Sequence, residues 1–180
     1  MATGFYAANN PMAAMMSVAI GAGTFGVGTF YFMWQNAINM GALGEQMAAH
    51  GKLGYLLSSI APHGASEMSG FMISSAAGFA LGYAILCPGL LSRREAFAKV
   101  GKDAIAMACT AVVMTWVAAP FEGWFSFNPH VTTPFKLIVA ALALTGWLAF
   151  FIGYGVENDE SKSPQAARPS INTTNVEPKL

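Results

Sequence analysis

His63 and Glu67 are the residues of this 180-residue chain whose types and spacing most directly suggest chemistry. They stand four residues apart in the segment "APHGASE", which opens an uncharged run rich in small residues. If one helix includes both, they share a face, where an imidazole and a carboxylate could bind a metal ion or carry a proton. In the alternative interpretation, Glu67 lies in a first helical turn, where the macrodipole favours its charge, and His63 reaches toward water.

Glu122 is a second acidic residue in an apolar setting, within "AAPFEGWFS". It falls at the C-terminal end of a predicted helix, the end that disfavours an anion, and burial at a bilayer centre would cost about 2.5 to 3.5 kcal/mol. We therefore expect a compensating partner for Glu122. The candidates are His63, Gln35, Asn36 or a residue of a partner subunit, and His63 is the first of them.

The sequence predicts no enzyme, no cofactor and no metal. A metal site made of His63, Glu67 and Glu122, with His50 as a further ligand, is chemically reasonable, but no H-E-x-x-H or Cys/His spacing supports it. Ser66 adjoins the pair without a G-x-S-x-G elbow around it. The segment "GAGTFG" has the G-x-G-x-x-G pattern of dinucleotide sites but lacks the strand that must precede one, so it is read as helix-packing glycine.

Composition places the chain in a bilayer. Apolar residues make up 54% of it and charged residues only 10%, compared with about 25% charged residues in soluble domains. Net charge is zero and there is no basic patch with interleaved aromatic residues, which excludes nucleic acid as an expected partner. The fold class expected is therefore an all-α integral membrane protein.

Four transmembrane helices are predicted from the length of the apolar runs. The predicted spans are Met12–Trp34, Ser66–Leu86, Ala104–Phe121 and Leu137–Tyr154. The mixed segment between the first two is expected to form short interfacial or re-entrant helices, broken at Gly51 and Pro62. Residues 1–155 then form a single transmembrane domain, and the polar residues 156–180 a disordered tail.

The positions of the lysine and arginine residues predict how the chain is oriented in the membrane. Arg93 and Arg94 lie in a loop that also holds Lys99 and Lys102, so this loop should be cytoplasmic. Four spans then place both termini in the cytoplasm. In this topology Gln35, Asn36, His63, Glu67 and Glu122 lie at one membrane depth, as a polar intramembrane cluster at the outer ends of three helices.

The second predicted span carries a face of small residues. Gly70, Ser74, Gly78 and Gly82 recur at every fourth position and line one side of a helix. Such faces let helix backbones approach closely. We expect this face to pack against another helix, either within the chain or in a homo-oligomer.

Residues 9–127 closely resemble the stage II sporulation protein M family. The resemblance is carried by an Asn-Asn pair, a glycine-rich first helix, a His-Gly pair, a Pro-His-Gly-x-x-Glu segment, a Pro-Gly and Arg loop and a final Glu-Gly. The matching positions are Asn9, Asn10, Asn36, His50, Gly51, Pro62, His63, Gly64, Glu67, Gly78, Gly82, Pro88, Gly89, Arg93, Glu122 and Gly123.

The resemblance implies a multi-pass protein of a prokaryotic inner (cytoplasmic) membrane. The family's named member works with a cell-wall-degrading enzyme and a second membrane-anchored partner. The leading functional hypothesis is therefore a non-enzymatic scaffold or accessory subunit of a cell-envelope complex, in contact with lipid and with other membrane proteins. The alternative is a transporter or permease subunit that uses His63, Glu67 and Glu122, since ionisable residues inside a membrane often mark ion or substrate paths.

Overall fold

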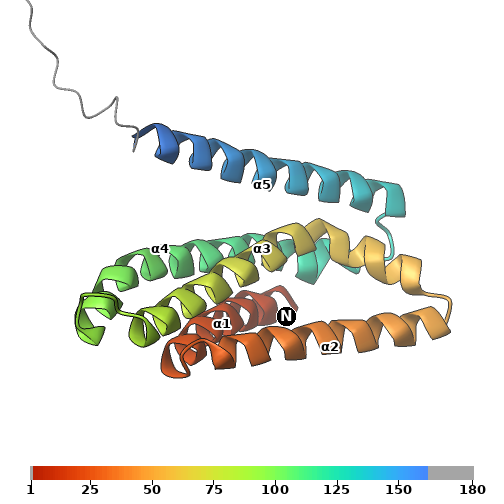
Figure 1. Ribbon diagram of the computed structural model, residues 1–180. Helices are drawn as coiled ribbons and strands as arrows, with labels where there is room; N and C mark the ends of the chain where they lie inside the picture. Colours follow the sequence, from red (N-terminus) through yellow and green to blue (C-terminus); the bar gives the residue numbers. More distant parts are fainter. Residues whose placement is uncertain (1, 162–180) are drawn as a thin grey trace, which may run out of the picture. The chain divides into compact units, whose positions relative to one another are not determined.

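The computed structural model describes residues 2–161, which are helical with no strand among them (Figure 1). The elements are α1 (Ala2–Gly23), α2 (Val27–Ala49), α3 (Leu53–Leu86), α4 (Arg93–Pro120), the π-helix η1 (Phe121–Ser126) and α5 (Thr133–Ser161). The prediction of an all-α chain is confirmed. The tail predicted for residues 156–180 lies largely outside the described residues, and α5 continues into its first part.

The chain divides into two compact units, Met1–Thr145 and Gly146–Leu180. The first contains α1 to α4, η1 and the start of α5. In the second, the described part of α5 has its own aromatic contacts, with the Trp147 ring stacked on Phe151 at 6.0 Å between centroids.

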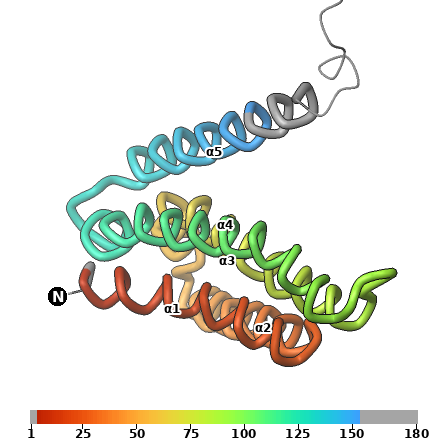
Figure 2. Tube along the Cα trace, turned by 90° about the vertical axis from the view of Figure 1, so that its left-hand side faces the viewer, coloured from red at the N-terminus to blue at the C-terminus, as the bar shows by residue number. Residues whose placement is uncertain are grey.

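Helix α3 is the central element of the first unit and packs against α1, α2 and α4. Both views show α1 to α4 running alongside one another, with the α1–α2 turn and the α3–α4 loop at the same end (Figures 1 and 2). Ala77 and Leu81 of α3 form a buried apolar core with Ala104 of α4. The two alanines at this contact allow α3 and α4 to approach closely.

The first predicted span, Met12–Trp34, is wrong as a single helix. The chain leaves α1 at Gly23 and reverses direction before α2 starts at Val27, so that α1 and α2 form a hairpin (Figure 1). Phe25 and Gly26 have φ values of 55° and 91°, in the left-handed region that a right-handed helix cannot contain.

Thr24 supplies the physical reason for this turn. Its hydroxyl donates to the carbonyl of Ile20 at 2.6 Å and accepts from the amide of Gly28 at 2.7 Å. A threonine side chain that bonds to nearby backbone offers the chain an alternative to helical hydrogen bonding. The "GAGTFG" segment is therefore a helix–turn–helix junction, not the interior of a spanning helix.

The predicted break at Gly51 is present, and the predicted break at Pro62 is not. Gly51 has a φ of 66° in the turn that separates α2 from α3. Pro62 lies inside α3, which runs without interruption through both His63 and Ser66. A proline removes the hydrogen bond of its own nitrogen and its ring crowds the preceding turn. Intramembrane helices accommodate both effects when neighbouring helices cover the site.

Three helical segments of the described residues are long and apolar enough to cross a membrane: Leu53–Leu86, Arg93–Ser126 and Thr133–Gly153. These segments contain the second and third predicted spans and all but the last residue of the fourth, so the prediction of four spans is not confirmed. The prediction that both termini are cytoplasmic required an even number of membrane crossings. Because four crossings are not confirmed, the predicted location of the N-terminus loses that support.

Arg93 and Arg94 occupy the first turn of α4 and not a loop. The helix begins at a capping box, in which the Ser92 hydroxyl accepts from the Glu95 amide and the Glu95 carboxylate accepts from the Ser92 amide. This reciprocal pair satisfies two backbone donors that would otherwise lack a partner. It fixes the helix start at the end of the unit where the α1–α2 turn also lies.

Candidate functional site

Three ionisable side chains converge where η1 meets α3. One ligand atom each from His63, Glu67 and Glu122 lies within 4.8 Å of the others. The His63 Nε2 and Glu67 Oε2 atoms are 3.9 Å apart, one helical turn along α3. His63 is 4% exposed, and both carboxylates are half-buried. We call His63, Glu67 and Glu122 the acidic triad.

The π-helix explains how Glu122 reaches α3. Pro120 has no amide hydrogen to donate, and directly after it the chain widens from α4 into η1. In a π-helix the hydrogen bond runs from i to i+5, so residues four apart lie almost above one another. Glu122 and Ser126 consequently both reach α3 from η1, and a short π-helix of this kind is common at functional sites.

Ser126 and Asn10 surround the triad with neutral hydrogen bonds. The fully buried Ser126 hydroxyl is 2.7 Å from Nδ1 of His63. Asn10, on α1, donates from Nδ2 to Oε2 of Glu122 at 2.9 Å. The serine hydroxyl can serve either tautomer of the imidazole, so Nε2 of His63 can face the carboxylates with or without a proton. Three elements, α1, α3 and η1, thus contribute to one polar centre.

Asn10 is the partner of Glu122 that the sequence interpretation missed, since it proposed His63, Gln35 or Asn36. The signal for it was the Asn9–Asn10 pair within an apolar segment, because a buried amide must have hydrogen-bond partners. Asn9 in turn donates to Oδ1 of Asn10 at 3.3 Å. Ser126 had no comparable signal, because a single serine near the end of an apolar run is common.

Gln35, Asn36 and His50 are not among the described residues that form the triad or its hydrogen bonds. Asn36 is exposed on α2 and donates to the carbonyl of Phe32 in its own helix at 2.8 Å. No hydrogen bond among residues 2–161 joins Gln35 or Asn36 to Glu122. His50 closes the end of α2, with Nδ1 2.7 Å from the carbonyl of Gln46. The α1–α2 turn is the physical reason that the predicted cluster with Gln35 and Asn36 does not form, because it makes α2 a helix separate from α1.

The small-residue face of α3 packs within the chain. A Cβ atom added to Gly70 would lie 3.0 Å from the carbonyl oxygen of Ala111 on α4. One added to Gly78 would lie 2.8 Å from the carbonyl oxygen of Ser17 on α1. Gly82 faces the α1–α2 turn, and Ser74 is fully buried.

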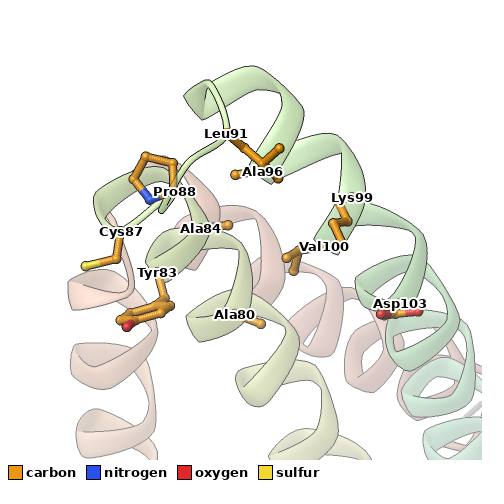
Figure 3. A pocket seen from close by; sticks show the side chains of 10 residues that line it. All are labelled: Ala80, Tyr83, Ala84, Cys87, Pro88, Leu91, Ala96, Lys99, Val100 and Asp103. Carbon is orange, nitrogen blue, oxygen red and sulfur yellow. The ribbon is translucent and has the colours of Figure 1, made fainter.

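A cavity of about 380 Å³ opens at the α3–α4 loop, toward the other end of α3 from the triad (Figure 3). Its lining is mainly apolar, with Tyr83 and Pro88 on one side and Lys99 and Asp103 on α4 on the other (Figure 3). The free thiol of Cys87 lies at its edge (Figure 3). This cavity shares no residue with the triad, so the two features are separate.

The fold and the triad together define an all-α membrane protein with a polar centre between its helices. The sequence model of the stage II sporulation protein M family matches residues 1–127, and the chain belongs to that family. The matched region contains α1 to η1, including every residue of the triad and its neutral partners. Comparison with curated proteins and with solved structures gives no match.

Proposed function

We propose that this protein is a non-enzymatic scaffold or accessory subunit of a membrane complex in a prokaryotic cell envelope. The observation that carries the proposal is the C-terminal part of α2, residues 36–49, which is exposed at all positions except Gly44 and Met47. The membership of the stage II sporulation protein M family supports an envelope location.

The composition of this half-helix suits neither lipid nor water alone. Exposed apolar side chains include Ile38, Met40 and Leu43. Asn36, Asn39, Glu45 and Gln46 are also exposed, and they lie outside an apolar stripe made of Ala37, Met40, Gly41, Gly44, Met47 and Ala48. Because nearly all of residues 36–49 are exposed, both the apolar stripe and the polar side of this amphipathic segment are left largely uncovered by the described residues. A partner protein that offers both apolar contacts and hydrogen bonds would stabilise it.

Site-specific photo-cross-linking in native membranes tests this proposal. With a photoreactive amino acid at Asn39, we expect an adduct of one discrete mass containing a second membrane protein, because the partner covers this side of α2. The matched control is Ile105, which is 67% exposed on the apolar helix α4 and should meet lipid. Adducts of equal yield at both positions, or none at Asn39, would contradict the scaffold proposal.

A transport subunit is the second candidate, favoured by the partly buried ionisable triad between helices. The two functions differ in the expected result of Glu122→Gln. A transport role predicts that the variant accumulates normally in the membrane and loses flux in proteoliposomes. A structural role predicts that it lowers the amount of assembled protein.

A further inference from the structure

We propose that the acidic triad is a binding site for one divalent transition-metal ion, Zn²⁺ or Mn²⁺, which joins α3 to η1. This inference goes beyond the scaffold function and departs from the sequence prediction of no metal. Its basis is the geometry of His63, Glu67 and Glu122, whose ligand atoms come from two elements and meet within 4.8 Å.

Charge is the first argument for a cation. Two carboxylates face one imidazole between helices that are apolar enough to span a membrane. Among residues 2–161 no lysine or arginine forms an ion pair with Glu67 or Glu122, and the Asn10 amide supplies only a neutral donor. Uncompensated like charges in a low-dielectric setting are costly, and a divalent ion would neutralise both carboxylates at once.

The arrangement around the ligands is the second argument. A metal-binding histidine usually has its other ring nitrogen hydrogen-bonded, which fixes its tautomer and orientation. Ser126 fills this role at Nδ1 of His63, at 2.7 Å, and leaves Nε2 on the side of the carboxylates. Ligating carboxylates are also hydrogen-bonded, as Glu122 is by Asn10 at 2.9 Å.

Ser59 is a buried polar residue without a hydrogen-bond partner within residues 2–161, four residues before His63. Its hydroxyl is fully buried and lacks a hydrogen-bond partner among the described residues. Ser59 lies one helical turn before His63, on the same face of α3. Three protein ligands leave a coordination position open for water. A metal-bound water on this side of α3 would provide the partner that a buried hydroxyl requires.

The donor set selects the class of ion. One imidazole nitrogen and two carboxylate oxygens suit Zn²⁺ and Mn²⁺, whereas Ca²⁺ requires six to eight oxygen ligands. Ligands about 2.1 Å from a tetrahedral ion lie roughly 3.4 Å apart. Rotations of the two half-buried glutamate side chains would close the triad from its present spacing.

Metal analysis of the purified full-length protein tests the proposal. Wild-type protein, stripped with a chelator in mild detergent and dialysed against ZnCl₂ or MnCl₂, should retain about one ion per chain. Glu67→Gln and His63→Gln should each lose at least nine tenths of this binding. Glu45→Gln, which removes an exposed carboxylate on α2, is the matched control and should bind as the wild type does.

A second measurement keeps the proposal testable if the triad variants fail to fold. In wild-type protein the chelator should lower the thermal unfolding temperature, and Zn²⁺ or Mn²⁺ should restore it, because an ion bound only by the folded state stabilises that state. Ser126→Ala should weaken metal binding by about 10- to 100-fold. Equal binding by wild type and Glu67→Gln, or an unfolding temperature that responds to neither chelator nor metal, would contradict the proposed metal site. A proton shared between the two carboxylates would then be the remaining explanation of how they lie so close together.

Discussion

Replacing Gly82 with alanine should lower the free energy of unfolding by about 3 kcal/mol. The added Cβ would lie 2.5 Å from the backbone nitrogen of Gly26 and 2.5 Å from the carbonyl carbon of Phe25. Both atoms belong to backbone in the α1–α2 turn, where φ is positive at both residues. Such atoms cannot rotate away as the end of a side chain can, so the whole hairpin must shift from α3.

Gly101→Ala is the matched control for this substitution. Gly101 lies inside α4, and nothing is within 4 Å of the Cβ that alanine would add. Alanine is favoured over glycine in a helix by up to about 1 kcal/mol, so this variant should be as stable as the wild type or slightly more stable. Equilibrium unfolding in mixed detergent micelles compares the two variants. Equal stability of Gly82→Ala and Gly101→Ala would show that the α1–α2 turn does not contact α3.

Asn10→Ala should cost about 2 kcal/mol of stability, since it removes a hydrogen bond to a carboxylate in a largely buried place. Asn10 is 8% exposed and donates to Oε2 of Glu122 at 2.9 Å. Asn9→Ala is the control, because Asn9 is exposed and donates only to Asn10, at 3.3 Å. It should change stability by less than about 0.5 kcal/mol.

A double-mutant cycle separates the Asn10–Glu122 contact from a general effect of the asparagine. In a Glu122→Ala background the cost of Asn10→Ala should fall below about 0.5 kcal/mol, because the acceptor is already absent. All four proteins are compared in the same chelating buffer, so that metal binding does not contribute. If Asn10→Ala costs the same in both backgrounds, Asn10 is not the partner of Glu122.

The helices that are long and apolar enough to span a bilayer could be predicted from the sequence because their signal is local. Apolar runs of sufficient length located α3, α4 and α5. Gly51 marked the α2–α3 turn correctly, since a positive φ there suits glycine. His63 and Glu67 do share a face, because their spacing along one helix is sufficient to predict that.

The α1–α2 turn and the Asn10–Glu122 contact could not be predicted in the same way. The turn depends on two hydrogen bonds of one threonine side chain, Thr24, within an apolar run that hydropathy reads as continuous. The contact joins residues 112 positions apart, and only the path of α1 back along α3 brings them together. Pro62 misled the prediction because proline usually ends helices in water but not between packed helices.

Helix α1 is held against the other helices by polar contacts along its whole length. The indole nitrogen of Trp116, on α4, donates to the carbonyl of Ala7 at 2.9 Å. Farther along, the hydroxyl oxygens of Ser17 and Ser75 are 3.0 Å apart, and Thr29 of α2 donates to the carbonyl of Ser17 at 2.8 Å. These contacts fix the register in which Asn10 meets Glu122. The packing of α1 along α3 therefore brings the polar centre together.

Disulfide cross-linking between positions 17 and 75 tests that claim most directly. Side-chain oxygens 3.0 Å apart place the two Cβ atoms within reach of a disulfide. The protein would carry Ser17→Cys and Ser75→Cys with Cys87 and Cys109 replaced by serine, and a protease site inserted at Gly51, between α2 and α3. Ser17→Cys with Ser69→Cys, about 1.7 helical turns from position 75, is the control.

After mild oxidation in isolated membranes and cleavage at Gly51, the two fragments of the 17–75 variant should remain joined until a reductant is added, and those of the 17–69 control should separate. Fragments that separate in the 17–75 variant, or that stay joined equally in both, would contradict the packing of α1 against α3.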